Sequence, residues 1–374
     1  MTGAESPARA VEQPKPRVLL TAYKEGKGNS RPASSVPVVQ KNMNRKRVGR
    51  YPLALVAVVC SVVITVSCVP PTVPDPGVIA PPSGSGRDPS VDVAPSLGCS
   101  SRGSLLAPGR STVTLVIGGT TRTSLVDVPA GRPPVPRRLL VSLHPFLMGP
   151  ETWDWYSGLA AAGTDRGYVV VTPLGSQPGP RWAVPGGLAA EGDDLAFIGS
   201  LVDHVERNAC VDRNRVFAAG FSAGAAMAQA LSCTMPGRFA GVAGSGGVNL
   251  TSRCLDSPGT DVLVMHGTAD PIVPPGGSQI PFTPPVGLSV ATVVADDAAR
   301  AGCDPEPVVD RNATTVRRVR YRNCLGGRRV IHLSLEGAGH TWAGSPNTLL
   351  ELVTGPTNAD ISATATVLDF FDAG

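Results

Sequence analysis

From about residue 99 to the C-terminus, short apolar runs alternate with segments in which apolar residues recur three or four positions apart. The short runs predict buried strands, and the wider spacing predicts helices. Strands that alternate with helices indicate a mostly parallel sheet with helices on both faces, so the predicted fold class is α/β. The predicted strands are 112–117, 124–128, 139–143, 168–171, 216–219, 239–243, 262–265, 316–321 and 330–335, and the predicted helices are 152–165, 194–205, 223–231, 286–301 and 361–371.

The N-terminal part of the chain carries a different pattern. An uncharged apolar run at 53–66 follows a cluster of four basic residues. The run is short for a membrane-spanning helix, which needs about 20 apolar residues, and it fits the central region of a secretory signal. We therefore expect a signal peptide at 43–68 that starts at Met43. We expect residues 1–42 to be a disordered extension that was mis-assigned to the start of the chain.

The end of the apolar run resembles a bacterial lipobox. It reads Thr65-Val66-Ser67-Cys68, and a small residue before a cysteine is the pattern that precedes lipid attachment. We expect Cys68 to carry a lipid; ordinary signal cleavage and an uncleaved anchor remain the alternatives. Residues 69–98 contain eight prolines among Gly, Ser and Asp, which predicts an extended linker. The chain is thus expected to be exported, at the cell surface or extracellular, with its domain at 99–374.

The net charge of +4 hides a strong asymmetry. Residues 1–50 hold 11 Lys or Arg and only 3 Asp or Glu, so the remainder of the chain is net acidic. A nucleic-acid-binding domain would carry its basic patch on the folded part. We therefore expect no nucleic-acid partner, and membrane contact only through the signal or the lipid anchor. The sequence does not indicate an oligomeric state.

Six cysteines lie beyond the signal region, and an even number in an exported domain indicates disulfides. Six cysteines allow 15 connectivities, so the sequence leaves most pairings open. Cys303 and Cys324 form the best local pair, because they bracket a charged, hairpin-like stretch. The chain has no Cys-x-x-Cys or His-x-His spacing, so no metal site is expected.

The sequence Gly220-Phe221-Ser222-Ala223-Gly224 fits G-x-S-x-G. It follows a predicted strand and begins a predicted helix, which is the setting in which this motif presents a nucleophile. Small flanking residues permit the tight turn that raises the serine hydroxyl above the sheet. The helix N-terminus then offers N–H groups, that of Ala223 above all, to a developing oxyanion. The alternative is a turn in which small residues only assist packing.

A serine nucleophile requires a base and an acid, which follow it in the order acid then histidine in this architecture. Asp270 comes directly after a buried strand and is the candidate acid, although Asp-Pro is also a common turn pair. His340 lies in a Gly-rich loop after the last predicted strand and is the candidate base, with His332 as the runner-up. The other histidines are His144 and His266, which precede the acid, and His204, inside a predicted helix.

The second oxyanion donor should come from the loop after the strand at 139–143. This loop reads His144-Pro145-Phe146. Proline has no N–H, so Phe146 or Leu147 must donate; the alternative is an ordinary strand exit. We expect no metal, nucleotide or other cofactor.

Taken together, these motifs resemble those of the exported α/β-hydrolases related to polyhydroxybutyrate depolymerases and to feruloyl and acetylxylan esterases. The resemblance covers about 97–371. It rests on LLVSLH, on the DDLAF that begins at Asp193, on VDRNRVFAAGFSAGAAMAQALSC, on VLVMHGTADPIVP and on GAGHTWAG. The family usually has His-Gly where this chain has His144-Pro145.

The resemblance implies an esterase in which Ser222 is the nucleophile, Asp270 the acid and His340 the base. It also implies a disulfide between Cys303 and Cys324. Trp182 and Trp342 match positions at which the family has tryptophans that line the acyl site, although packing is an equally good explanation. We expect an ester substrate, polymeric esters included. A serine peptidase on the same fold and a non-catalytic surface-binding module are the alternative functions.

Overall fold

The computed structural model describes residues 93–100, 106–131, 135–176, 179–187, 192–277, 287–345 and 351–374. The extension at 1–42, the signal at 43–68, the lipidation candidate Cys68 and most of the predicted linker lie outside the described residues. Within the described part, no helix is both long and apolar enough to cross a membrane.

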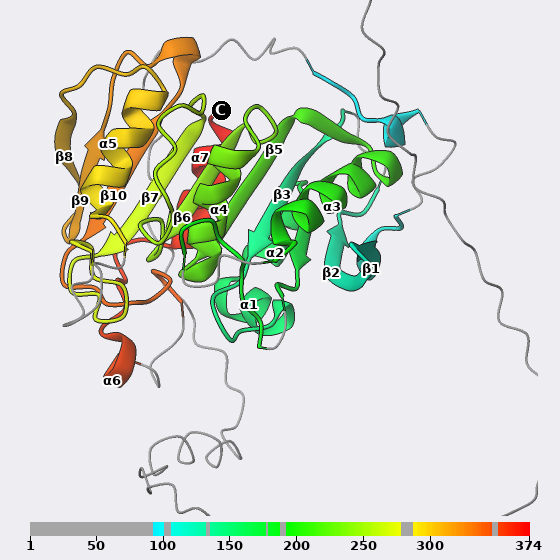
Figure 1. Cartoon of the computed structure of the whole chain (residues 1–374), viewed down its shortest axis with the longest axis horizontal. Coiled ribbons are helices and arrows are strands. Elements are labelled where there is room, and N and C mark those ends of the chain that lie inside the picture. The colour runs from blue at the N-terminus through cyan, green and yellow to red at the C-terminus, as the bar shows by residue number, and fades with distance from the viewer. Residues whose placement is uncertain are drawn as a thin grey trace, which may run out of the picture. The chain divides into compact units, whose positions relative to one another are not determined.

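The described chain builds one ten-stranded sheet (Figure 1). The order of strands is β1-β2-β4-β3-β5-β6-β7-β10-β9-β8, and the six strands from β4 to β10 in this order are parallel. A β1–β2 hairpin extends one edge and an antiparallel β9–β8 pair extends the other. The strands are β1 Gly109–Ile117, β2 Thr120–Val128, β3 Arg137–Leu143, β4 Val169–Pro173, β5 Val211–Phe221, β6 Gly241–Ser245, β7 Asp261–Gly267, β8 Val308–Ala313, β9 Val316–Arg320 and β10 Val330–Leu335.

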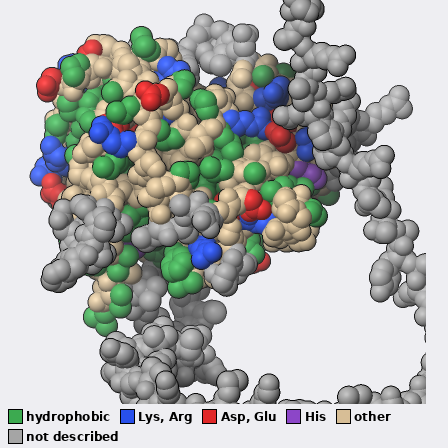
Figure 2. Space-filling view, in the orientation of Figure 1, with side chains coloured by type: hydrophobic (Ala, Val, Ile, Leu, Met, Phe, Trp, Pro, Cys, Tyr) green, Lys and Arg blue, Asp and Glu red, His purple; other side chains and the backbone are tan. Residues whose placement is uncertain are grey.

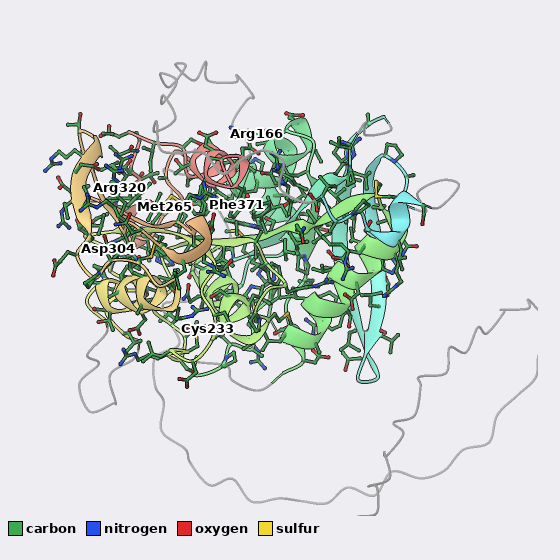
Figure 3. All side chains as sticks on the ribbon, turned by 90° about the horizontal axis from the view of Figure 1, so that it is seen from above. Arg166, Cys233, Met265, Asp304, Arg320 and Phe371 are labelled. Carbon is green, nitrogen blue, oxygen red and sulfur yellow. A yellow bond between two sulfur atoms is a disulfide. The ribbon has the colours of Figure 1, made fainter. Side chains whose placement is uncertain are left out.

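Helices cover both faces of the sheet, as the alternation of patterns predicts. Helices α3, α4 and α5 bury one apolar cluster against one face, and α1, α2 and α7 bury a second cluster against the other. Figure 3 shows this division edge-on, with Phe371 of α7 and Cys233 of α4 on opposite sides of the sheet. The helices are α1 Pro150–Ser157, α2 Leu159–Asp165, α3 Asp194–Asn208, α4 Ala223–Thr234, α5 Val290–Arg300, α6 Glu351–Thr354 and α7 Ala363–Asp372, and short 3₁₀ turns span Leu97–Cys99 and Leu325–Gly327.

The single helix predicted at 152–165 is wrong in one respect, because the structure divides it into α1 and α2. Gly158 separates the two with a φ of 67°, a left-handed conformation that glycine adopts without steric cost. Strand β8 is also absent from the sequence expectations. Half of its residues, VVDRNA, are polar or charged, and none is fully buried at the sheet edge, so the strand carries no long apolar run.

The N-terminal end of the described chain is fastened to the amino end of β5. The Ala94 N–H donates to Asp212 Oδ1 at 3.0 Å, and Cys99 forms a disulfide with Cys210. Contacts with the domain therefore begin at Ala94. The sequence pattern places the end of the linker slightly later, at residue 98.

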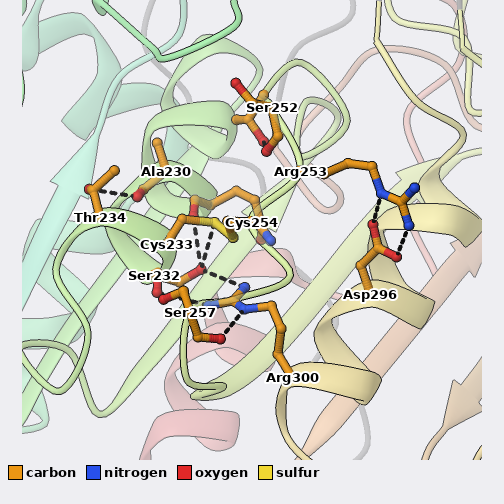
Figure 4. Close-up of a disulfide and its surroundings, with 12 residues drawn as sticks. Ala230, Ser232, Cys233, Thr234, Ser252, Arg253, Cys254, Ser257, Asp296 and Arg300 are labelled. Atoms are coloured by element: carbon orange, nitrogen blue, oxygen red, sulfur yellow. Dashed lines mark hydrogen bonds and ion pairs between the residues drawn. A yellow bond between two sulfur atoms is a disulfide. The ribbon is translucent and has the colours of Figure 1, made fainter.

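The described residues form two further disulfides. One joins Cys303 to Cys324, and the other joins Cys233 at the end of α4 to Cys254. Around the second bond, Arg253 forms an ion pair with Asp296 of α5, as Figure 4 shows. This group holds α4 against α5. Three disulfides are typical of exported proteins.

Loss of the Cys99–Cys210 bond should weaken the domain most, because this bond spans 111 residues and the other two span 21 each. The entropy of the unfolded chain that a disulfide removes grows with the length of the closed loop. We expect the double variant Cys99→Ser, Cys210→Ser to lose about 2–5 kcal/mol in the free energy of unfolding. Urea titration measures this loss, and an unchanged midpoint would show that the bond contributes nothing.

Acidic and basic side chains are interspersed on the face of the molecule that Figure 2 displays. Ion pairs at the surface of the domain include Arg166 with Asp369, Arg253 with Asp296, and Arg318 with Asp310. Such exposed pairs contribute little to stability individually.

Candidate active site

Ser222 lies at the sharp turn between β5 and α4. Its φ of 53° and ψ of −119° place a non-glycine residue in an unfavourable backbone conformation, which typically costs about 1–3 kcal/mol. The Ser222 N–H donates to Ser245 O at 2.8 Å, and this contact with the end of β6 helps to hold the turn. The turn that the G-x-S-x-G pattern predicts is therefore present, with the serine at its apex.

The small residues around Ser222 are required by close backbone contacts. A Cβ added to Gly224 would collide with the Leu143 carbonyl group of β3, and one added to Gly220 would collide with Gly224. Both glycines thus allow the start of α4 to approach the neighbouring strands.

Gly224→Ala should destabilise the domain by about 1–3 kcal/mol, the usual cost of overpacking, and should lower ester turnover by displacing the turn. Gly276→Ala is the matched control, because a Cβ there has nothing within 4 Å. Thermal unfolding and initial rates measured on both variants test this prediction. Equal effects at the two positions would contradict it.

Asp270 and His340 reach Ser222 from neighbouring strands. Asp270 follows β7 and His340 follows β10, and the carboxyl ends of these parallel strands lie at the same sheet edge as that of β5. His340 Nδ1 lies 2.7 Å from Asp270 Oδ2, and His340 Nε2 lies 2.9 Å from Ser222 Oγ. The structure therefore joins the three residues that the sequence analysis selected.

Hydrogen bonding fixes the tautomer of His340. An ionised carboxylate only accepts, so Nδ1 carries the ring proton and donates to Asp270. Nε2 then has a free lone pair and accepts from the Ser222 hydroxyl. The backbone N–H of His340 donates to Thr354 O at 2.5 Å, so the loop that carries His340 is bonded to the end of α6. His340 is buried, and its ring packs 4.8 Å from that of Phe221.

The carboxylate of Asp270 is held on both oxygens. Oδ1 accepts from the backbone N–H groups of Ile272 and Val273, at 2.9 and 2.8 Å. Burial alone would raise the pKa of Asp270. Hydrogen bonds from His266 and His340 to Oδ2 outweigh that effect and hold the pKa well below its usual range. Asp270 is thus ionised throughout the neutral range.

His266 is a neighbour of the site that the sequence analysis set aside. Its Nε2 lies 2.8 Å from Val273 O and 3.5 Å from Asp270 Oδ2. The spacing of four residues between His266 and Asp270, across a strand exit, was the available signal. The runner-up base, His332, lies within β10, where its Nε2 has no hydrogen-bond partner among the described residues. Burial lowers the pKa of His332 to about 4.

One oxyanion candidate, Ala223, directly follows Ser222 in the chain, and the other, Phe146, follows the strand next to β5. Ala223 is the first residue of α4, and the first N–H groups of a helix have no acceptor within the helix. Phe146 follows β3, the neighbour of β5, and its side chain is exposed. The alternative donor, Leu147, is already used, because its N–H donates to Pro180 O at 2.8 Å.

Both tryptophans that the resemblance assigned to the acyl site are buried and pack against other aromatic rings, and their contact with an acyl group stays a prediction. Trp342 is 1% exposed and packs edge-on to Trp153 in the core beneath α1 and α7. Trp182 is 3% exposed and packs against the ring of His144. Their indole N–H groups are satisfied internally, by Thr364 Oγ1 and by the His144 carbonyl oxygen.

Within the described residues, no group of three or more His, Cys, Asp or Glu side chains could hold a metal ion.

Comparison with known proteins gives a consistent result. The family model described as phospholipase/carboxylesterase matches residues 193–279, which include Ser222 and Asp270. NocK of Nocardia uniformis subsp. tsuyamanensis, a protein named as an esterase, is 31% identical over 289 residues, which is 70% of this chain and 82% of NocK. Feruloyl esterase B of Piromyces equi is 29% identical over 213 residues, 54% of this chain and 39% of that protein.

Among solved structures, the acetyl xylan esterase from Aspergillus awamori is 15% identical, with a TM-score of 0.49 over 71% of this chain and all of that chain. The likeness to NocK spans most of both proteins, and the sheet order, the helical layers and the serine turn described above agree with it. The chain therefore belongs to the α/β-hydrolase esterases, the family that includes NocK.

Proposed function

We propose that this esterase is a serine hydrolase in which Ser222 is the nucleophile, His340 the general base and Asp270 the residue that orients the base. The observation that carries the proposal is the unbroken hydrogen-bonded series from Asp270 through His340 to Ser222 Oγ. Each contact has the geometry that its chemical role requires, and Ser222 occupies the strained turn that exposes a nucleophile.

The first half of the reaction forms an acyl-enzyme. Ser222 Oγ attacks the ester carbonyl carbon while His340 Nε2 takes the hydroxyl proton. The carbonyl oxygen becomes an oxyanion in a tetrahedral intermediate, and Asp270 stabilises the imidazolium. The intermediate collapses when the bond to the alcohol oxygen breaks and His340 gives its proton to the departing alkoxide.

Water completes the reaction by the same steps. His340 removes a proton from water, and the resulting hydroxide attacks the acyl carbon. Collapse of the second tetrahedral intermediate returns the proton to Ser222 Oγ and releases the acid. The N–H groups of Ala223 and Phe146 would stabilise both oxyanions, because one lies at the start of α4 and the other at the exit of the adjacent strand β3.

Hydrolysis of p-nitrophenyl acetate tests the activity. The wild-type chain should release p-nitrophenol with saturable kinetics, and the corresponding p-nitroanilide should react far more slowly because amides are harder to cleave. Release at the rate of buffer alone would contradict the esterase proposal. Faster cleavage of the anilide would favour the peptidase alternative.

Feruloyl esters are the substrate class we propose first. Several relatives are named feruloyl esterases, among them those of Piromyces equi and Neurospora crassa. Acetylated sugars and polyhydroxyalkanoate esters require the same machinery and are the alternatives. We expect kcat/KM for ethyl ferulate to exceed that for a hydroxybutyrate trimer and for acetylated xylose. The reverse order for either competitor would reassign the substrate.

The same proposal includes export and anchoring. A signal at 43–68, a lipid on Cys68 and the linker that follows would hold the hydrolase at the cell surface, and the three disulfides of the domain fit that location. Mass spectrometry of the mature N-terminus tests this arrangement. A diacylglyceryl group on Cys68 supports it, and an unmodified N-terminus at another residue contradicts the anchor.

A further inference from the structure

His144 forms an unusually complete set of contacts for a residue outside the three that bear the reaction. It is fully buried at the exit of β3. The Gly175 N–H donates to its Nε2 at 2.9 Å, so Nε2 must hold a lone pair. The single ring proton is therefore on Nδ1, which donates to Pro145 O at 2.8 Å.

That carbonyl belongs to the same peptide group as the Phe146 N–H. A peptide group is planar and trans, so its C=O and N–H point in opposite directions. Fixing the Pro145 carbonyl against the His144 ring therefore fixes the direction of the Phe146 N–H. Met148 N–H donates to the same carbonyl at 3.3 Å and supports this orientation from the other side of the turn.

A second segment, which we name the clamp segment (residues 175–176 and 179–183), holds His144 and its loop. The Trp182 ring lies 4.6 Å from the His144 ring, and its Nε1 donates to His144 O at 2.8 Å. Pro180 O accepts from the Leu147 N–H at 2.8 Å. The clamp segment thus contacts the loop before and after Phe146.

The clamp segment is in turn fixed by a buried carboxylate. Asp194, at the first turn of α3, is completely buried. Its Oδ2 accepts from the Ala183 N–H at 2.7 Å and from Ser176 Oγ at 2.9 Å, and its Oδ1 forms an ion pair with Arg122 of β2. A continuous series of contacts therefore connects β2 and α3 to the loop at 144–147, which follows β3.

The electrostatic environment keeps the imidazole in the required state. Burial lowers the pKa of His144 to about 4, against a smaller opposing effect of the hydrogen bond to Pro145. The ring is neutral at neutral pH, so Nε2 remains an acceptor for the Gly175 N–H.

We propose that His144 is a positioning residue whose imidazole aims the Phe146 N–H at the oxyanion formed at Ser222. This inference rests on the proposed function, because it assumes that Phe146 is the second oxyanion donor. It explains why a proline is acceptable directly after His144. Pro145 contributes the carbonyl that His144 holds, and the N–H that proline lacks is supplied by the next residue.

Two substitutions separate positioning from structural support. In His144→Asn, the amide nitrogen takes the place of Nδ1 and can still donate to Pro145 O, whereas the acceptor for Gly175 is lost. His144→Leu loses both. We expect His144→Leu to lower kcat by about 10- to 100-fold, below the loss for a deleted oxyanion donor, with KM within about threefold of wild type. His144→Asn should recover most of kcat.

The affinity of a boronic acid inhibitor provides a readout that a packing role would not change. Its adduct with a nucleophilic serine is tetrahedral and places an oxygen where the oxyanion forms, so its inhibition constant should rise in parallel with the loss of kcat. Trp182→Phe, which keeps an aromatic ring but loses the donor to His144 O, should show a smaller loss of the same kind. It is the second test should His144→Leu not fold.

His204→Leu is the matched control, because His204 is a half-buried residue of α3 and should leave kcat unchanged. If His144→Asn is as impaired as His144→Leu, or if kcat falls while boronate affinity stays constant, the positioning role is wrong. Wild-type kcat in every His144 variant would also overturn the positioning role. If turnover in those variants still depends on Ser222, the proposed function remains intact. Turnover that does not depend on Ser222 would overturn both.

Discussion

Ser222→Ala is expected to lower kcat for p-nitrophenyl acetate by about 10⁵- to 10⁶-fold, the loss typical of removing a serine nucleophile from such a triad. The substitution removes only Oγ, whose hydrogen bond among the described residues is with His340 Nε2. The Ser222 backbone bond to Ser245 O does not involve the side chain and should persist. Folding should therefore be retained while turnover is lost.

Ser252→Ala is the matched control for this experiment, because the Ser252 hydroxyl is exposed and donates only to Pro185 O. It should retain wild-type kcat. Turnover by Ser222→Ala within tenfold of the control would show that another residue provides the nucleophile.

Asp270→Asn is expected to reduce kcat by about 10⁴-fold with little change in structure. The amide nitrogen of the new side chain can donate to His340 Nδ1, which forces the ring proton onto Nε2. A protonated Nε2 cannot accept from the Ser222 hydroxyl, so general-base catalysis is lost. The backbone N–H groups of Ile272 and Val273 would still find an oxygen acceptor. Steady-state rates measured beside Asp256→Asn, a substitution away from the site, test this prediction.

The depressed pKa of Asp270 also predicts that the free energy of unfolding depends on pH. The pKa of Asp270 is lower in the folded chain than in the unfolded chain, so its ionised form stabilises the fold. This contribution is complete above the unfolded value of about 4 and declines as pH falls below it. The wild type should therefore be more stable than Asp270→Asn at pH 7, and the difference should shrink by pH 3. A difference independent of pH would contradict the depressed pKa.

The order of residues in the chain was sufficient to select Ser222, Asp270 and His340, because strand exits and loop composition are local features. The pattern also predicted the parallel centre of the sheet, whose strands are continuous apolar runs. It failed at β8, which lies at a partly exposed edge and needs no apolar face.

The contacts around His144 were not predictable, because they join residues far apart in the sequence. The bond from Gly175 spans 31 positions, and that from Trp182 spans 38. The sequence left the packing of Trp342 open for the same reason. It lies two residues after His340, and its ring packs into a core formed with α1 and α7.

The most direct test of the account is to label the wild-type chain with a fluorophosphonate and locate the adduct by peptide mass spectrometry. In this reaction the serine oxygen displaces fluoride from phosphorus, and it requires an activated nucleophile. We expect one adduct per chain, on Ser222, with complete loss of ester turnover. An adduct on a different residue, or turnover that persists after Ser222 is fully labelled, would contradict the account.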